Sequence, residues 1–158
     1  MKFKKSQSGR SMVEMLGVLA IIGVLSVGGI AGYSLSMRRH RANGVVDLAS
    51  KYALIVYNQC QQKVLNGELS TDTNNPDSIF CDTDVITFEN AGIGNLPAGV
   101  SRIQDPAAEI GYGSKSDIVY FSIHFDDDKL CQATASIAGK TCNHDTTPPF
   151  IEFRIKQN

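Results

Sequence analysis

The feature that most constrains this 158-residue chain is an uncharged apolar run near its N-terminus. Residues 15–37, MLGVLAIIGVLSVGGIAGYSLSM, contain no Asp, Glu, Lys or Arg over 23 positions. As an α-helix that rises 1.5 Å per residue, such a run is long enough to cross the roughly 30 Å hydrocarbon core of a bilayer. A soluble protein rarely carries such a stretch, so we expect residues 15–37 to span a membrane.

Charge is segregated along the chain. Residues 1–41 carry seven Lys or Arg and the single acid Glu14, a net charge of +6, whereas residues 42–158 carry eight Lys or Arg and fifteen Asp or Glu, a net charge of −7. The basic segment before the run resembles the positive region of an export signal. Because Arg38-Arg39-His40-Arg41 follows the run, the positive-inside rule gives little indication of orientation. The acidic body argues against nucleic acid as a partner.

Residues 42–65 continue from the run without an intervening proline and are amphipathic. Their apolar residues recur at the i, i+3, i+4, i+7 spacing of one helix face, which predicts packing on a core. Asn66-Gly67 is a typical helix stop, because both residues tolerate the left-handed conformation. We therefore predict one helix of about fifty residues, with Gly28-Gly29 and Gly44 as its weakest points. Its expected apolar face comprises Val45, Leu48, Ala49, Tyr52, Ile55, Val56, Cys60 and Val64.

Short strands and turns are expected after the helix. Residues 66–84 form a polar loop by composition, and residues 90–99 form a Gly-rich turn region. The acidic segment 126–129 is expected to be a hairpin turn. Alternating or continuous apolar residues predict strands at 85–88, 118–125, 130–137 and 151–155.

Four cysteines lie in the acidic part of the chain and none in the apolar run. In an exported domain an even number of cysteines most simply forms two disulfides, and four cysteines permit three connectivities. We favour Cys60–Cys81 and Cys131–Cys142, because each closes a short loop within one supersecondary unit. The alternative is four free thiols in a cytosolic protein, and the export-like N-terminus argues against it.

Enzyme and metal-site motifs are absent from the sequence. His40, His124 and His144 lack metal-ligand spacing, and His124 falls on the polar face of a predicted strand, where a surface position is expected. Asp126-Asp127-Asp128 lacks the ligand alternation of a calcium loop, which favours a solvated turn. Nucleophile-elbow and phosphate-loop patterns are also missing. We therefore expect no enzyme activity, no metal and no cofactor.

A more specific pattern surrounds the start of the apolar run. A short basic leader ends at Gly9, Glu14 stands five residues after that glycine, and about twenty apolar residues follow. This N-terminus resembles that of type IV prepilins and type II secretion pseudopilins over about thirty residues. The rest of the chain matches in outline only, as a helix that leads into a small sheet with a C-terminal cysteine loop. Arg10 departs from the pattern, since the family usually has an apolar residue there.

In that family a membrane peptidase cuts after the glycine and methylates the new N-terminus, and mature subunits pack their helices into a filament core. The resemblance therefore implies cleavage between Gly9 and Arg10 and N-methylation of Arg10. It also implies that Glu14 pairs with the N-terminal amine of a neighbouring subunit, because a carboxylate at the edge of a bilayer core is costly without a partner. From Glu14 alone, the alternative is a helix-end charge stabilised by the helix dipole.

Together these patterns predict an α+β, pilin-like fold, in which a long N-terminal helix packs on an antiparallel sheet of about four strands with disulfide-tied loops. Residues 1–9 would be the leader peptide, residues 10–41 the transmembrane and filament-core helix, and residues 42–158 the globular domain.

The resemblance implies a structural subunit, major or minor, of a type IV pilus or a type II secretion pseudopilus. The implied partners are identical or related pilin subunits, the prepilin peptidase, the inner-membrane assembly platform and, before assembly, inner-membrane lipid. The globular domain would lie outside the cytoplasm of a bacterial cell, on a single-pass anchor and then in the filament. Two alternatives stay open: a secreted binding domain released near Gly29-Ile30-Ala31, and a membrane-anchored periplasmic binding domain that never forms filaments.

Overall fold

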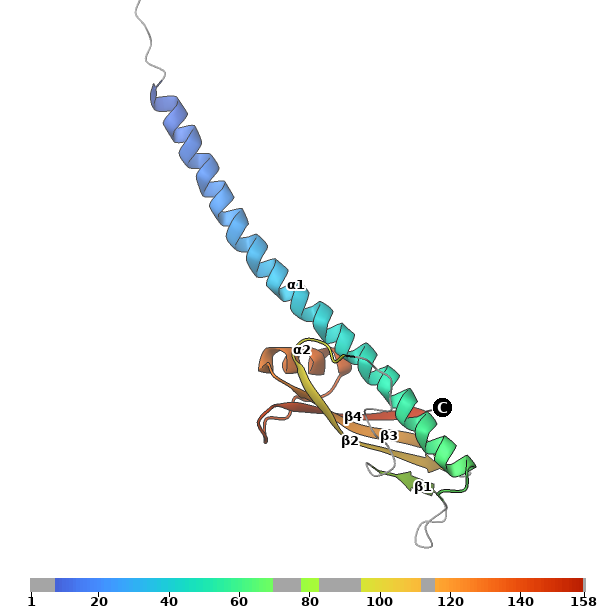
Figure 1. Ribbon diagram of the computed structural model, residues 1–158. Helices are drawn as coiled ribbons and strands as arrows, with labels where there is room; N and C mark the ends of the chain where they lie inside the picture. The colour runs from blue at the N-terminus through green and yellow to red at the C-terminus, as the bar shows by residue number, and fades with distance from the viewer. Residues whose placement is uncertain (1–7, 70–77, 83–94, 112–115, 158) are drawn as a thin grey trace, which may run out of the picture. The chain divides into compact units, whose positions relative to one another are not determined.

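The computed structural model describes residues 8–69, 78–82, 95–111 and 116–157 (Figure 1). The predicted strand at 85–88 lies outside these residues, as does much of the predicted turn region 90–99. The described elements are α1 (Ser8–Leu65), β1 (Ser78–Cys81), β2 (Val100–Gly111), β3 (Asp117–Phe125), α2 (Asp128–Ala138) and β4 (Phe150–Gln157).

The four described strands form one antiparallel sheet in the order β1-β2-β3-β4 (Figure 1). Phe121 of β3 lies opposite Phe153 of β4, and Ile79 of β1 lies opposite Ile110 of β2. The predicted α+β class is confirmed, and a long apolar helix together with a four-stranded antiparallel sheet fits a pilin-like fold.

The chain falls into two compact units, Met1–Met37 and Arg38–Asn158, and α1 contributes to both. As predicted, the helix ends just before Asn66-Gly67, and the Gly67 N–H donates a 3.0 Å hydrogen bond to the Val64 carbonyl. Neither Gly28-Gly29 nor Gly44 interrupts the helix.

In the second unit, α1 packs on the sheet through the apolar face predicted for it. Most of that face is buried, while Ile55 and Val64 are half-buried at its margin. The Tyr52 ring meets Phe121 edge-on at a centroid distance of 5.0 Å, and Phe121 stacks on Phe153 at 5.3 Å. These rings hold helix and sheet together in the middle of the core. The buried residues on this face of α1 are Val45, Leu48, Ala49, Tyr52, Val56 and Cys60.

Two of the predicted strands are confirmed as β3 and β4, but β1 and β2 were not predicted. The apolar tetrapeptide of β1 is short and lies within a polar stretch. In β2, register shifts between Val100 and Arg102 and between Gln104 and Ala107 break the two-residue alternation, and Pro106 lies within the second. Bulges of this kind hide a strand from periodicity.

The strand predicted at 130–137 is wrong, because these residues belong to the helix α2. The Asp127 side chain caps this helix by accepting the Lys129 N–H at 3.1 Å, and Gly139 supplies a left-handed C-cap. The buried residues Leu130, Cys131, Thr134 and Ala135 follow helical spacing. The acidic segment before them is therefore a helix start and not a hairpin turn.

Gly99 is required where the chain enters β2. Its φ of +94° is a conformation that side chains other than glycine rarely adopt. A Cβ atom at this position would also lie 2.6 Å from Cδ2 of Leu130. The missing side chain therefore lets the start of β2 pass close to α2.

Both disulfides have the pairing that the sequence favoured. Cys60–Cys81 links the end of α1 to β1, and Cys131–Cys142 links α2 to the segment before β4, with Cα–Cα distances of 5.9 and 5.8 Å. Although the loops that they close are short, each disulfide stabilises the fold by about 3 kcal/mol in the chain-entropy description.

A polar network joins the end of α1 to the sheet. The Tyr57 hydroxyl donates to Oδ2 of Asp117 at 2.5 Å and accepts from Nε2 of Gln61 at 2.6 Å, while Oδ1 of Asp117 accepts the Gly111 N–H at 2.9 Å. The bond to Asp117 is the main reason why the pKa of Tyr57 is raised to about 12. The phenol therefore stays a donor throughout the neutral range.

We predict that Tyr57→Phe lowers the free energy of unfolding by about 1–2 kcal/mol, because a hydrogen bond to a carboxylate is lost. Urea denaturation of the oxidised protein measures this. Tyr120→Phe is the matched control, since the Tyr120 hydroxyl makes only a 3.5 Å contact with Glu109. An equal effect of the two substitutions would contradict the role given to the Tyr57 bond.

Candidate functional site

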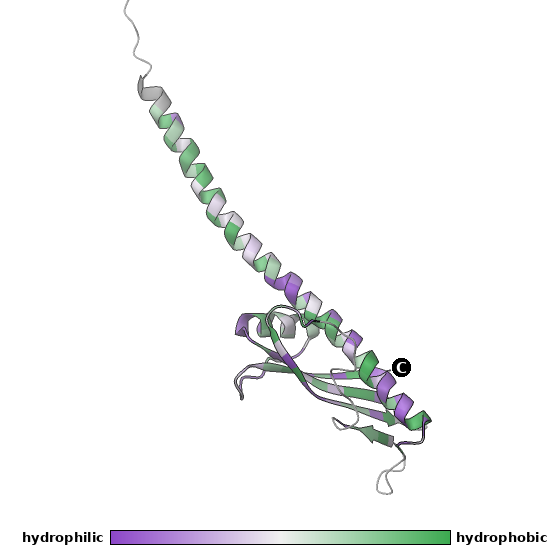
Figure 2. Ribbon diagram, viewed as in Figure 1, coloured by the Kyte–Doolittle hydropathy of each residue, from purple (hydrophilic) through white to green (hydrophobic). Residues whose placement is uncertain are grey.

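The first unit presents the predicted apolar run as an exposed helix surface. Figure 2 shows this part of α1 as mostly apolar. Fourteen large hydrophobic residues between Met12 and Leu35 are each at least 50% exposed. By length and composition, the helix contains a window able to span a membrane, although a signal sequence near an N-terminus would pass the same test. This surface needs an apolar environment.

Glu14 is the only charged residue between positions 11 and 37, and its side chain is exposed on α1. It forms no ion pair with the described residues. Because α1 begins at Ser8, Glu14 lies beyond the first helical turn, in which the dipole acts most strongly on a carboxylate. The helix-dipole explanation for Glu14 is therefore weak in the uncut chain.

Gly9 and Arg10 lie at the start of α1, on the same helix as Glu14. Residues 1–7 of the predicted leader lie outside the described residues. The glycines along the run leave the helix backbone open: a Cβ added at Gly17, Gly23, Gly28, Gly29 or Gly32 would meet no atom within 4 Å. A neighbouring helix could approach closely at such positions.

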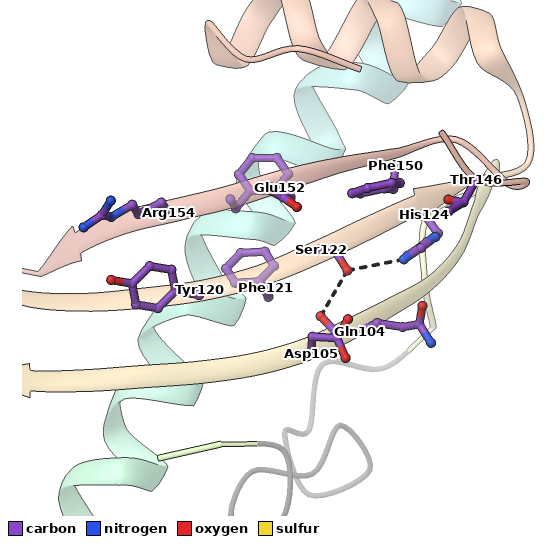
Figure 3. Close-up of a pocket in the computed structure, with 11 residues that line it drawn as sticks. Gln104, Asp105, Tyr120, Phe121, Ser122, His124, Thr146, Phe150, Glu152 and Arg154 are labelled. Atoms are coloured by element: carbon purple, nitrogen blue, oxygen red, sulfur yellow. Dashed lines mark hydrogen bonds between the residues drawn. The ribbon is translucent and has the colours of Figure 1, made fainter. Parts of the chain in front are cut away.

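A second candidate site lies on the sheet, on the face that carries Tyr120, Ser122 and His124 (Figure 3). These side chains border a cavity of about 620 Å³ together with residues of β2, β4 and the segment before β4. The guanidinium of Arg154 lies 5.3 Å from the centre of the Tyr120 ring, within cation–π range. The remaining lining residues include Gln104, Asp105, Thr146, Phe150 and Glu152.

The prediction that His124 lies at the surface is wrong, since only 7% of this residue is exposed. Its ring stacks on Phe150 at 5.2 Å, and Nε2 lies 3.3 Å from the Ser122 hydroxyl. Burial, with the charge of Arg102, lowers the pKa of His124, while the Pro148 carbonyl and Asp105 oppose this shift. The polar face of β3 is thus covered at its end by the segment that precedes β4.

Among the residues that the structure describes, the Ser122–His124 pair has no third group that orients the imidazole. The Ser122 hydroxyl also donates to the Gln104 carbonyl at 3.3 Å, so its proton has a backbone acceptor. In the described part of the chain, no carboxylate forms a hydrogen bond to the imidazole. A nucleophilic serine needs a base that is oriented by a third group.

The acidic segment 126–128 makes contacts that stabilise the start of α2. Asp127 caps α2, and Asp128 accepts from Gln132 at 2.8 Å and lies 3.2 Å from Nδ1 of His144. Ligand atoms of Asp128, His144 and Cys142 come within 4.8 Å of one another. Cys142 is bonded to Cys131, however, and offers no thiolate to a metal ion.

No family model, curated protein or solved structure matches this chain.

The predicted site residues are distributed in two places. Gly9, Arg10 and Glu14 share the start of α1, and the four cysteines meet as two pairs in the second unit. The cavity beside His124 was not predicted. Aromatic and polar residues occupy one face of β3 and β4, and this mixture was the available signal.

We predict that His124 contributes to the pH dependence of stability. Because its folded pKa lies below the ordinary value of 6.5, the unfolded chain binds the proton first, and stability falls as the pH drops below about 6.5. His124→Gln should remove this part of the decline in urea denaturation of the full chain in detergent. His40→Gln, which changes an exposed histidine, should leave the decline in place. An unchanged pH profile for His124→Gln would refute this prediction.

Proposed function

We propose that this chain is a structural subunit of a type IV pilus or a type II secretion pseudopilus. It is cut and methylated by a prepilin peptidase, is held in the bacterial inner membrane by the first half of α1, and assembles into a filament through that same half. The observation that carries the proposal is the exposed uncharged run with Glu14 near its start.

The energetics of the run support an apolar partner. Burying a large hydrophobic side chain gains about 1.5–3 kcal/mol relative to leaving it in water. For fourteen such residues, the gain is on the order of tens of kcal/mol. Neither lipid nor a bundle of like helices exposes the run to water, so moving it from one to the other costs little.

Glu14 favours a filament subunit over a protein that is only anchored in the membrane. Cleavage after Gly9 would make Arg10 the new N-terminus and Glu14 the fifth residue of the mature chain. A carboxylate at this depth is costly in lipid and gains a partner when the amine of a neighbouring subunit lies beside it. Such a pair favours assembled subunits over subunits alone in the membrane.

The second unit supports export. Two disulfides suit an oxidising compartment outside the cytoplasm. This unit buries its core on the second half of α1, from Ala42 to Cys60, and does not use the apolar run for that core. The run therefore stays available for lipid before assembly and for neighbouring helices afterwards.

Mass spectrometry of the mature N-terminus tests the proposal. We expect the chain to begin at Arg10 and to carry one added methyl group. An N-terminus near Gly32 would instead identify a secreted domain, and an intact leader would identify a simple membrane anchor.

We predict that Gly9→Val blocks removal of the leader, because the peptidase of this family cuts after a residue without a side chain. The measurement is the mass of the chain recovered from membranes of cells that contain the peptidase. Gly17→Val is the matched control, because it places the same side chain in the same helix where nothing lies within 4 Å. Normal maturation of the Gly9→Val chain would contradict the prepilin assignment.

We predict that Glu14→Ala leaves membrane insertion intact, since it removes a charge from an apolar segment. Filament recovery should fall at least about tenfold, because an unpaired charge buried in the filament core costs several kcal/mol. Glu14→Gln keeps the shape of the side chain and should show the same loss, which would identify the charge as the cause. Filaments sheared from cells and quantified by immunoblot give the measurement. Normal filament yield with either variant would reduce Glu14 to a helix-end charge.

A further inference from the structure

The two disulfides differ in their surroundings. Cys60 and Cys81 are both fully buried members of the hydrophobic core, contributed by a helix and a strand. Cys131 is also fully buried, but its partner Cys142 is partly exposed. Cys142 is therefore the less buried end of this bond, although it also packs against the core.

Cys142 lies in irregular backbone between Gly139 and Phe150. Besides the disulfide, backbone hydrogen bonds hold this segment: Asn143 and Phe150 exchange two at 2.8 and 3.0 Å, the Lys140 N–H donates to the Ala135 carbonyl at 2.9 Å, and the Phe125 N–H donates to the Pro149 carbonyl at 2.8 Å. His144 adds an exposed contact with Asp128. Next to Cys142 itself, the backbone bonds are those of Lys140 and Asn143, and a stretch held by so few bonds opens locally at a low free-energy cost.

The core around Cys60–Cys81 has no comparable weak point in the described residues. Cys60 is in the last turns of α1 and Cys81 pairs with Ala108 of β2, which is itself fully buried. A reagent can reach these sulfur atoms only when α1 or β1 separates from the core. That opening exposes the buried side chains of Cys60, Ile79 and Cys81 to water.

We propose that Cys131–Cys142 is a reducible disulfide, opened by an external dithiol at Sγ of Cys142, while Cys60–Cys81 stays closed. One thiolate of the dithiol attacks Sγ of Cys142, the disulfide breaks, and the Cys131 sulfur leaves with the electron pair and takes a proton from water. The second thiolate then attacks the mixed disulfide and releases Cys142. The protein gains two thiols, and the dithiol becomes a disulfide.

This inference concerns the second unit alone and does not depend on filament assembly. Reduction would remove the covalent link between α2 and the segment that precedes β4, while α2 would keep its cap at Asp127 and its buried contacts through Leu130 and Ala135. The sheet and α1 would remain linked by Cys60–Cys81. The partner implied by this chemistry is a thiol–disulfide oxidoreductase with a reduced dithiol, for which dithiothreitol is the chemical probe.

The test uses the full oxidised chain, purified in detergent without reductant. Dithiothreitol is added for increasing times, samples are quenched in acid, free thiols are alkylated, and peptides are mapped by mass. We expect Cys131 and Cys142 to become alkylated at least about tenfold faster than Cys60 and Cys81, because their bond needs only local opening. Simultaneous reduction of both disulfides, or earlier reduction of Cys60–Cys81, would overturn the proposal.

Two further measurements make the test specific. With glutathione in place of dithiothreitol, the first mixed disulfide should map to Cys142, and an adduct on Cys131 would count against the proposed direction of attack. The rate of reduction of Cys131–Cys142 should depend weakly on urea concentration below the unfolding transition. The rate of reduction of Cys60–Cys81 should rise steeply with urea concentration. Equal urea dependence would mean that both bonds open by the same global unfolding.

Discussion

The structure depends on one helix whose two halves have different surfaces. The first half of α1 carries large apolar side chains in every direction, whereas the second half confines them to one face. No folded sheet could bury the first half, because a helix that is apolar all round needs apolar contacts on every side. The second half needs only one covered face, and the four-stranded sheet provides it. The change occurs near the boundary at Met37 and Arg38.

The second unit follows from that single buried face. Tyr52 and Phe121 join helix and sheet in the core, Tyr57 and Asp117 tie the end of α1 to the start of β3, and Cys60 links the same end of α1 to β1. At the other end of the sheet, the Cys131–Cys142 disulfide links α2 to the segment before β4, and the Leu130 side chain of α2 lies close to Gly99. The second unit thus has a separate disulfide at each of its two ends. Reduction at one end can leave the other intact.

Much of the fold could be predicted because its signals are periodic. The apolar face of α1, the alternation in β3 and β4 and the helix stop at Asn66-Gly67 each depend on side-chain spacing alone. The α2 helix was missed because Asp126-Asp127-Asp128 fits both a turn and a helix cap, and its buried residues had no known partner surface. β2 was missed because bulges break its period, and His124 because the segment that covers it is distant in sequence. Contacts between residues distant in sequence determine the structure of these parts.

If the apolar half of α1 enters a filament, its apolar side chains cannot by themselves set the position of one subunit against the next. Hydrophobic contact is nondirectional, and a helix sliding along like helices exchanges one apolar contact for another. Glu14 is the only charge between residues 11 and 37, so it is the one group in this stretch whose energy changes sharply with axial position. A pair between Glu14 and a neighbouring N-terminal amine forms in one register and is broken in others. In the proposed filament, apolar contacts then provide most of the stability, and Glu14 selects the register.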